Sequence, residues 1–271
     1  MLNEKTQEQL HREDLQRLRG FRPMDDDFMR MLFRNNKPLA QMVIRIITGI
    51  DDLVITDAIT QYDLKRLVGA RSICLDVFCT DNSGKKYDIE VQRDDSGASP
   101  HRARYHSSSM DVEILSANQK FEDLPETYVI FITEKDCFEE GKPIYIIDRV
   151  NKNTNKDFND GEHIIYVNGE YVGDSDIGRL MHDFRCTSAD DMNFDILADR
   201  TRYFKENLEG VSEMCKAMED MRNEAEKTGS DSRAIEIAKA LIDLGKNTIE
   251  DIAETTKLPL EVIKNLAESK I

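Results

Sequence analysis

The chain has 271 residues, of which 53 are acidic and 37 are basic, so its formal net charge at pH 7 is −16. This acidity argues against a nucleic-acid-binding protein, because neutralising phosphates usually requires a basic surface. It argues equally against a polybasic membrane anchor. The length allows one large domain or two smaller ones, each able to bury a hydrophobic core.

The cysteines, histidines and apolar residues exclude several further classes. No apolar stretch approaches the roughly 18 residues that span a bilayer, and the first residues are polar rather than those of a signal peptide. We therefore expect a protein of the reducing cytoplasm. The 5 cysteines form no C-x-x-C pair and the 5 histidines show no H-E-x-x-H spacing. Buried structural thiols are thus expected, rather than a disulfide framework or a zinc site.

The first fifty residues are predicted to be helical. A loose helix over residues 1–20 is broken at residues 21–23, which include a proline. Three aspartates at 25–27 then supply cap and first-turn carboxylates, which suit the positive end of a helix dipole. The helix that follows should end at Gly49 and be interrupted near Pro38.

Beyond Gly49 the pattern changes to short strands. They are predicted at residues 53–59, 71–80, 86–92, 128–133, 144–148 and 163–168. Residues 81–84 (DNSG) have strong turn chemistry and join the second strand to the third. A helix is predicted over residues 103–118, between the third and fourth strands. This order of elements indicates a mixed α/β core.

From about Asp190 the chain is predicted to be helical again. Two interleaved series recur every seven residues: Leu197, Phe204, Val211 and Met218, and Thr201, Leu208 and Cys215. Such a stripe either forms a coiled-coil seam, giving a homodimer through residues 194–227, or packs on the chain's own core. Two short helices near residues 249–255 and 259–268, the first capped by Thr248, are typical of a helix-turn-helix.

The hairpin around Ser83 carries the strongest chemical signal. Alternate side chains of a strand share a face, and directly paired residues of an antiparallel hairpin do so as well. A loop centred on Ser83 gives paired residue numbers that sum to 166, which places Asp76 opposite Glu90 and Cys74 opposite Gln92. A two-residue loop would instead shift the register by one. We adopt the centred loop because it brings the two carboxylates together.

Two carboxylates in apolar strands, with Cβ atoms about 5 Å apart, would repel each other strongly if they were dry. A divalent cation is the usual solution, and Mg²⁺ favours one or two carboxylates together with water and phosphate oxygens. The amide of Gln92 could orient an attacking water or contact a phosphate. The alternative is that Asp76 and Glu90 are ordinary polar residues on a solvated face of the sheet.

These residues resemble a known family. Asp76 with Glu90-Val91-Gln92, after a helix–strand–strand pattern, is similar to the PD-(D/E)XK nucleases and more narrowly to the PD-(D/E)XK nuclease family transposases. The matching stretches, over about residues 25–149, are Asp26-Asp27-Phe28-Met29, Ile47-Thr48-Gly49, RSICLDVFCTD, YDIEVQ, RARYHSSSMD and LPETYVIFITEKDCFEEGKPIYIIDR. The C-terminal tail also resembles the short helical ends of that family.

The resemblance implies a restriction-endonuclease-like α/β core, in which helices flank a mixed central sheet, with a helical C-terminal region. It implies that Asp76, Glu90 and the backbone carbonyl of Val91 hold Mg²⁺ or Mn²⁺. Gln92 stands where the family name has lysine. Because glutamine is neutral, this departure leaves open which group activates the water.

Three further residues are candidates for the site. A carboxylate of the first core helix often completes such a site, and Asp27 is the nearest one, although it also suits a helix cap. Arg102 and Arg104 lie at the start of the helix after the third strand, where they could clamp a backbone phosphate or be ordinary surface arginines.

The expected organisation is a helical extension over residues 1–22, a nuclease-like domain over 23–188 and a helical region over 189–271. The expected function is that of a metal-dependent DNA endonuclease that hydrolyses phosphodiester bonds and serves recombination or a mobile element. The alternative is a catalytically decayed nuclease fold that binds DNA or assembles through its helical tail.

Overall fold

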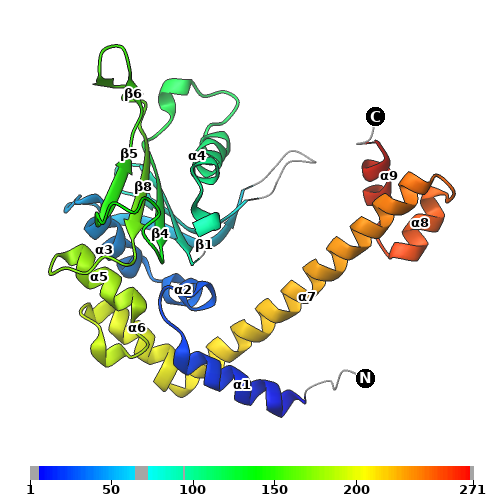
Figure 1. Cartoon of the computed structure of the whole chain (residues 1–271), viewed down its shortest axis with the longest axis horizontal. Helices are drawn as coiled ribbons and strands as arrows, with labels where there is room; N and C mark the ends of the chain where they lie inside the picture. Colours follow the sequence, from blue (N-terminus) through cyan, green and yellow to red (C-terminus); the bar gives the residue numbers. More distant parts are fainter. Residues whose placement is uncertain (1–5, 65–72, 94, 269–271) are drawn as a thin grey trace. The chain divides into compact units, whose positions relative to one another are not determined.

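A computed structural model describes residues 6–64, 73–93 and 95–268 (Figure 1). The contacts within the chain divide it into two compact units, residues 1–211 and residues 212–271. The first two residues of the strand predicted at 71–80 lie outside the described residues.

A mixed six-stranded sheet is the centre of the first unit in the described part of the chain. Its order is β1-β2-β3-β4-β8-β5. The strands are β1 (Ile55–Asp63), β2 (Cys74–Asp81), β3 (Lys86–Gln92), β4 (Thr127–Thr133), β8 (Glu162–Asn168) and β5 (Ile144–Ile147). β4 is parallel to both β3 and β8, and the other pairs are antiparallel. Every residue of β4 is buried, as its unbroken apolar pattern predicts for a central strand covered on both faces.

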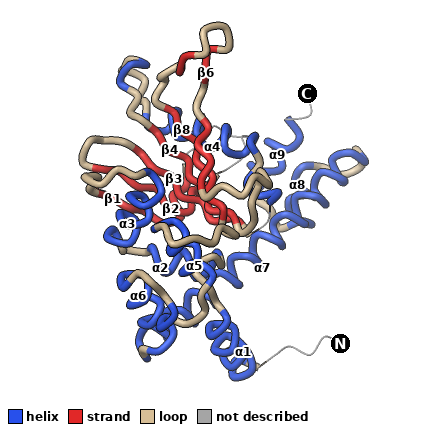
Figure 2. Tube along the Cα trace, turned by 60° about the vertical axis from the view of Figure 1, so that its left-hand side comes forward, coloured by secondary structure: helices blue, strands red, loops and turns tan. Residues whose placement is uncertain are grey.

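Helices cover the two faces of the sheet (Figures 1 and 2). α4 (Pro100–Ile114) lies on one face, and α3 (Lys37–Thr48) and α5 (Asp176–Arg185) lie on the other. α2 (Asp26–Phe33) also contacts β1, β2 and β3. The predicted interruption near Pro38 is confirmed, because the side chain of Asn36 caps α3 by accepting a hydrogen bond from the backbone N–H of Leu39. The remaining helix of the N-terminal region is α1 (Gln7–Gly20).

The hairpin of β2 and β3 has the predicted register. Its pairs run from Val77 with Ile89 to Thr80 with Lys86, so that paired numbers sum to 166. The carboxylate of Asp81 fixes the turn by accepting hydrogen bonds from the backbone N–H groups of Ser83 (2.8 Å) and Lys85 (3.0 Å).

The predicted pairing of Cys74 with Gln92 is wrong. The ladder between β2 and β3 ends at Val77 and Ile89, so it contains neither the Cys74–Gln92 pair nor the Asp76–Glu90 pair; at its other edge, Cys74 pairs with Asp63 on β1. β2 therefore separates from β3 at the point where the two strands carry Asp76 and Glu90.

Several elements between residues 149 and 190 have no clear signal in the sequence. The small hairpin of β6 (Val150–Asn151) and β7 (Lys156–Asp157) and the helix α5 were not predicted. Their segments lack the long apolar periodicity that marks an element, because α5 has only ten residues and the hairpin strands have two each.

The predicted seven-residue stripe is divided between two helices. α6 (Asp195–Glu206) ends at Asn207, whose backbone is extended, and α7 (Leu208–Leu244) begins directly after it. Leu197, Thr201 and Phe204 on α6 are buried, and this helix contacts α2 and α3. Packing on the chain's own core therefore describes this part of the stripe.

The second unit consists of the greater part of α7 with two short helices, α8 (Ile249–Thr256) and α9 (Leu260–Glu268). Ala238, Ile252 and Ile263, one from each helix, form its core. Thr248 caps α8 as predicted, because its side chain accepts a hydrogen bond from the backbone N–H of Asp251.

Candidate functional site

The separation of β2 from β3 creates the candidate site. The backbone N–H of Asp76 donates to Oε1 of Glu90 at 3.0 Å, and the backbone N–H of Val91 approaches Oδ2 of Asp76 at 3.4 Å. Each carboxylate thus accepts a backbone N–H from the opposite strand. Asp76 is 8% exposed and Glu90 is fully buried, so the expectation of a solvated face of the sheet is wrong.

Glu90 lies at the centre of the cluster. Its Oε2 accepts a hydrogen bond from Nη2 of Arg102 at 3.0 Å and lies 3.4 Å from the amide nitrogen of Gln92. The structure therefore brings Asp76, Glu90, Val91, Gln92 and Arg102 together, as the sequence predicted. α4 supplies Arg102, because Ser99 caps this helix and sets the start of its first turn beside β3.

Asp88 and His106, which no sequence motif singles out, also belong to the cluster. Nδ1 of His106 lies 3.0 Å from Oδ2 of Asp88, and Nε of Arg102 donates to Nε2 of His106 at 3.2 Å. Because an arginine nitrogen only donates, Nε2 accepts and Nδ1 carries the proton that binds Asp88. Strand and helix periodicity could have found both residues: Asp88 precedes Glu90 by two, and His106 follows Arg102 by four.

The three carboxyl groups of the cluster all have raised pKa values, with burial as the largest cause. Burial raises the pKa of Asp76 to about 6; Arg30 opposes this rise and Asp26 adds to it. Burial also raises the pKa of Glu90 well above its ordinary value, with further contributions from Asp88 and Asp76. The pKa of Asp88 is raised in the same way, by burial and then by Asp76. A bound cation would favour the charged form of all three carboxylates.

The acid of α2 that acts on the cluster is Asp26 rather than Asp27. Asp27 binds Nη2 of Arg17 at 3.1 Å, on the side of α2 that faces α1, so the structure does not bring it to Asp76. Asp26 adds to the raised pKa of Asp76. One turn further along α2, Nη2 of Arg30 lies 3.9 Å from Oδ1 of Asp76.

The two arginines of α4 also differ in position. Arg102 contacts Glu90 and His106, whereas Arg104 is exposed. Residues two apart on a helix do not share a face, so only one of the two can reach the cluster. The structure does not bring Arg104 to the site.

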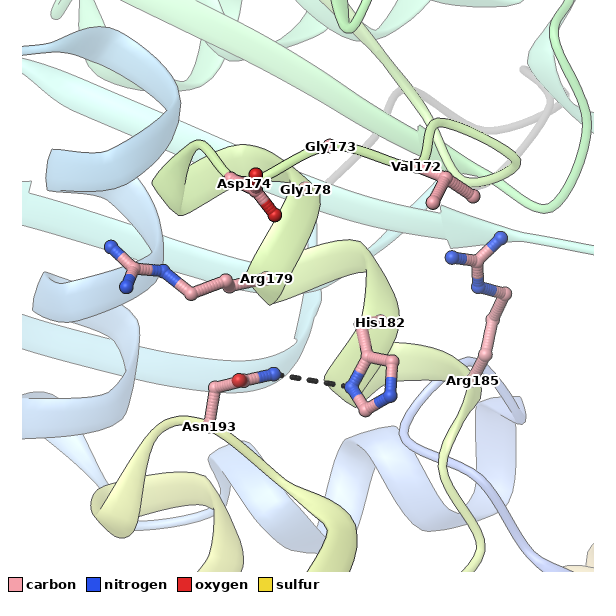
Figure 3. Close-up of a pocket in the computed structure, with 8 residues that line it drawn as sticks. All are labelled: Val172, Gly173, Asp174, Gly178, Arg179, His182, Arg185 and Asn193. Atoms are coloured by element: carbon pink, nitrogen blue, oxygen red, sulfur yellow. Dashed lines mark hydrogen bonds between the residues drawn. The ribbon is translucent and has the colours of Figure 1, made fainter.

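A second group of metal-ligand types lies on α5, beside a cavity of about 260 Å³ that Arg179, His182, Arg185 and Asn193 help to line (Figure 3). His182, Asp183 and Cys186 approach one another there. The buried carboxylate of Asp183 accepts hydrogen bonds from the backbone N–H groups of Asn193 and Phe194, each at 2.9 Å, and from the Asn193 amide at 2.7 Å. It therefore fastens the start of α6 to α5.

Replacing Asp183 with alanine should destabilise the fold by about 3 kcal/mol, because three donors would lose a buried charged acceptor. Urea denaturation of the variant would measure this loss. Asp174→Ala, at an exposed residue that lines the same cavity, is the matched control and should change the stability by less than about 0.5 kcal/mol. An equal effect of the two substitutions would contradict the assigned role of Asp183.

The comparison with family models bears directly on this arrangement. The model for "PD-(D/E)XK nuclease family transposase" matches residues 34–196, which is more than half of the chain. The chain belongs to this family. The match contains Asp76, Asp88, Glu90, Gln92 and the whole of α4. The searches of curated proteins and of solved structures gave no match.

Membership of the PD-(D/E)XK nuclease family transposases agrees with the fold, a mixed sheet flanked by helices with a helical C-terminal region. It supports a nuclease-type enzyme. Asp26 and Arg30 precede the matched residues, so their contribution to the site comes from the structure alone. Among the described helices, none is both long enough and apolar enough to cross a membrane.

Proposed function

We propose that the chain is a metal-dependent DNA endonuclease that hydrolyses phosphodiester bonds, in the service of recombination or a mobile element. The observation that carries the proposal is the contact of Asp76 with Glu90 in a buried gap between two strands. Membership of a nuclease family supports the reaction class and makes DNA the expected substrate.

Asp76, Glu90 and the carbonyl of Val91 are the proposed metal ligands. The N–H of Val91 points toward Asp76, and the N–H and C=O of a strand residue point to the same side, so this carbonyl faces the same gap. Oxygen ligands of this kind suit Mg²⁺ or Mn²⁺, and a bound cation would offset the burial that raises the pKa of Asp76. When bound, such an ion supplies a Lewis acid for phosphodiester hydrolysis.

The side chains around these ligands have separate tasks in the proposed mechanism. Arg102 and Arg30 supply positive charge for a phosphate, and Nε of Arg30 is buried without a hydrogen-bond partner among the described residues. The amide of Gln92 can donate to or accept from a water, but it brings no charge to lower the pKa of that water.

Nicking of supercoiled DNA tests the proposal. We expect the purified chain to cut in Mg²⁺ or Mn²⁺ and to be inactive in excess chelator. Absence of cleavage with every divalent ion would overturn the proposal and favour the alternative, a decayed nuclease fold that binds DNA or assembles through its helical region.

Gly97 leaves room for the side chain of Gln92, and its substitution should affect cleavage. A Cβ atom at Gly97 would lie 2.1 Å from Oε1 of Gln92, so Gly97→Ala must displace that amide. We expect cleavage to fall by roughly ten- to a hundredfold, because small displacements in a site are costly, while the melting temperature changes little. Gly20→Ala, where a Cβ meets nothing within 4 Å, is the control. Unchanged cleavage in Gly97→Ala would show that Gln92 has no part in the reaction.

A further inference from the structure

Asp88, Glu90 and His106 bring three ligand atoms within 4.8 Å of one another. The two carboxylates are fully buried and His106 is 2% exposed. This group shares Glu90 with the proposed Asp76 site. Of its other two members, Asp88 lies two residues before Glu90 on β3 and His106 lies on α4.

The partners of Asp88 are incomplete. Its Oδ2 receives the proton of His106, whereas its Oδ1 is buried and has no hydrogen-bond donor among the described residues. One carboxylate oxygen of Asp88 and one of Glu90 lie within 4.8 Å of each other. Two carboxylates buried this close together are a place where a cation would offset their mutual repulsion.

The group on α5 provides an internal comparison. His182, Asp183 and Cys186 also lie within 4.8 Å, but both oxygens of Asp183 accept hydrogen bonds from the loop before α6. Its carboxylate is therefore satisfied without an ion. The unpartnered Oδ1 distinguishes the Asp88 group from the group on α5. A buried acceptor without a donor needs a partner, and a cation is one that two carboxylates and an imidazole can bind.

We propose that Asp88, Glu90 and His106 form a second cation site, which takes a divalent first-row transition-metal ion such as Mn²⁺. A nitrogen ligand beside two carboxylates favours such an ion over Mg²⁺ or Ca²⁺, which prefer oxygen alone. The site does not depend on the proposed nuclease activity, because it is argued from the burial of these groups and the unpartnered oxygen of Asp88.

Occupation of the site requires Arg102 to move. His106 can offer Nδ1 to an ion only if its proton shifts to Nε2, and a protonated Nε2 cannot accept the hydrogen bond from Nε of Arg102. The side chain of Arg102 is 39% exposed, so it has room to leave. In the metal-free state the guanidinium of Arg102 thus binds Glu90. When the ion binds, the guanidinium becomes available to a phosphate.

Pulsed EPR of Mn²⁺ bound to the full chain tests the proposal, because it detects a directly coordinated imidazole nitrogen. We expect this ¹⁴N modulation in the wild type and its loss in His106→Gln, and about a hundredfold weaker Mn²⁺ binding at this site in Asp88→Asn. His182→Gln controls for the group on α5 and should keep the signal. Absence of the modulation in the wild type, or its persistence in His106→Gln, overturns the proposal.

Two further variants keep the result decisive. Asp88→Asn preserves the size of the side chain, so it reports on the site even if His106→Gln does not fold; unchanged Mn²⁺ affinity would overturn the proposal. Asp76→Asn separates the second site from the nuclease proposal, because it removes a ligand of the first site and leaves all three ligands of the second. The nitrogen signal should persist in this variant while cleavage is lost.

Discussion

Asp76→Asn and Glu90→Gln are each expected to reduce metal-dependent DNA cleavage by about a thousandfold. Both substitutions keep the shape of the side chain and remove one of the two negative charges that would hold the cation. Each amide oxygen can still accept the backbone N–H that the carboxylate accepts now, so the hairpin should remain folded. Initial rates of plasmid nicking in Mg²⁺, for proteins prepared in parallel, measure the effect.

Asp27→Asn is the matched control for these two variants. It removes a carboxylate from α2 that binds Arg17 and lies outside the cluster, so cleavage should stay within about twofold of the wild type. If Asp76→Asn and Glu90→Gln cut as fast as the control, the observed cleavage belongs to another site or to a contaminant.

The metal-free protein is expected to become less stable as the pH rises from about 4 to about 6. The ordinary pKa of Asp76 is 3.8, and burial raises it in the folded chain to about 6. Between these values the unfolded chain has released the proton and the folded chain keeps it, so unfolding is favoured as the pH rises. The difference corresponds to about 3 kcal/mol, reached near pH 6 and constant above it for this group.

Urea denaturation in chelator at several pH values measures this effect. Asp88 and Glu90 have raised pKa values as well, so the contribution of Asp76 is the difference between the wild type and Asp76→Asn. Excess divalent cation should restore stability at pH 8 by binding the ionised folded form. A wild type and an Asp76→Asn variant with the same pH dependence would contradict the assignment.

Much of the fold followed from local patterns in the sequence. β3 was predicted with its observed ends, because charged and apolar residues alternate along it between a strong turn and a polar stretch. The register followed from one choice about the turn at Ser83. The prediction that Asp76 and Glu90 meet depended on that choice and is confirmed by the contact between them.

The parts that could not be predicted depend on contacts distant in sequence. Whether Asp26 or Asp27 acts on the cluster is decided by the rotation of α2 against the sheet and by the presence of Arg17 on α1. His106 has one local signal, its spacing of four residues from Arg102, but only the packing of α4 on the sheet brings it to Asp88. The break at Asn207 likewise interrupts an unbroken seven-residue pattern.

Where β2 separates from β3, the carboxylates of Asp76 and Glu90 have a structural role that is independent of catalysis. Asp76 and Glu90 each accept a backbone N–H from the opposite strand. Selection for folding alone would therefore keep acceptors at both positions in a chain that had stopped cutting DNA. Gln92 and Arg102 satisfy no such backbone group with their side chains, so the first substitutions in a lineage that loses activity should appear there.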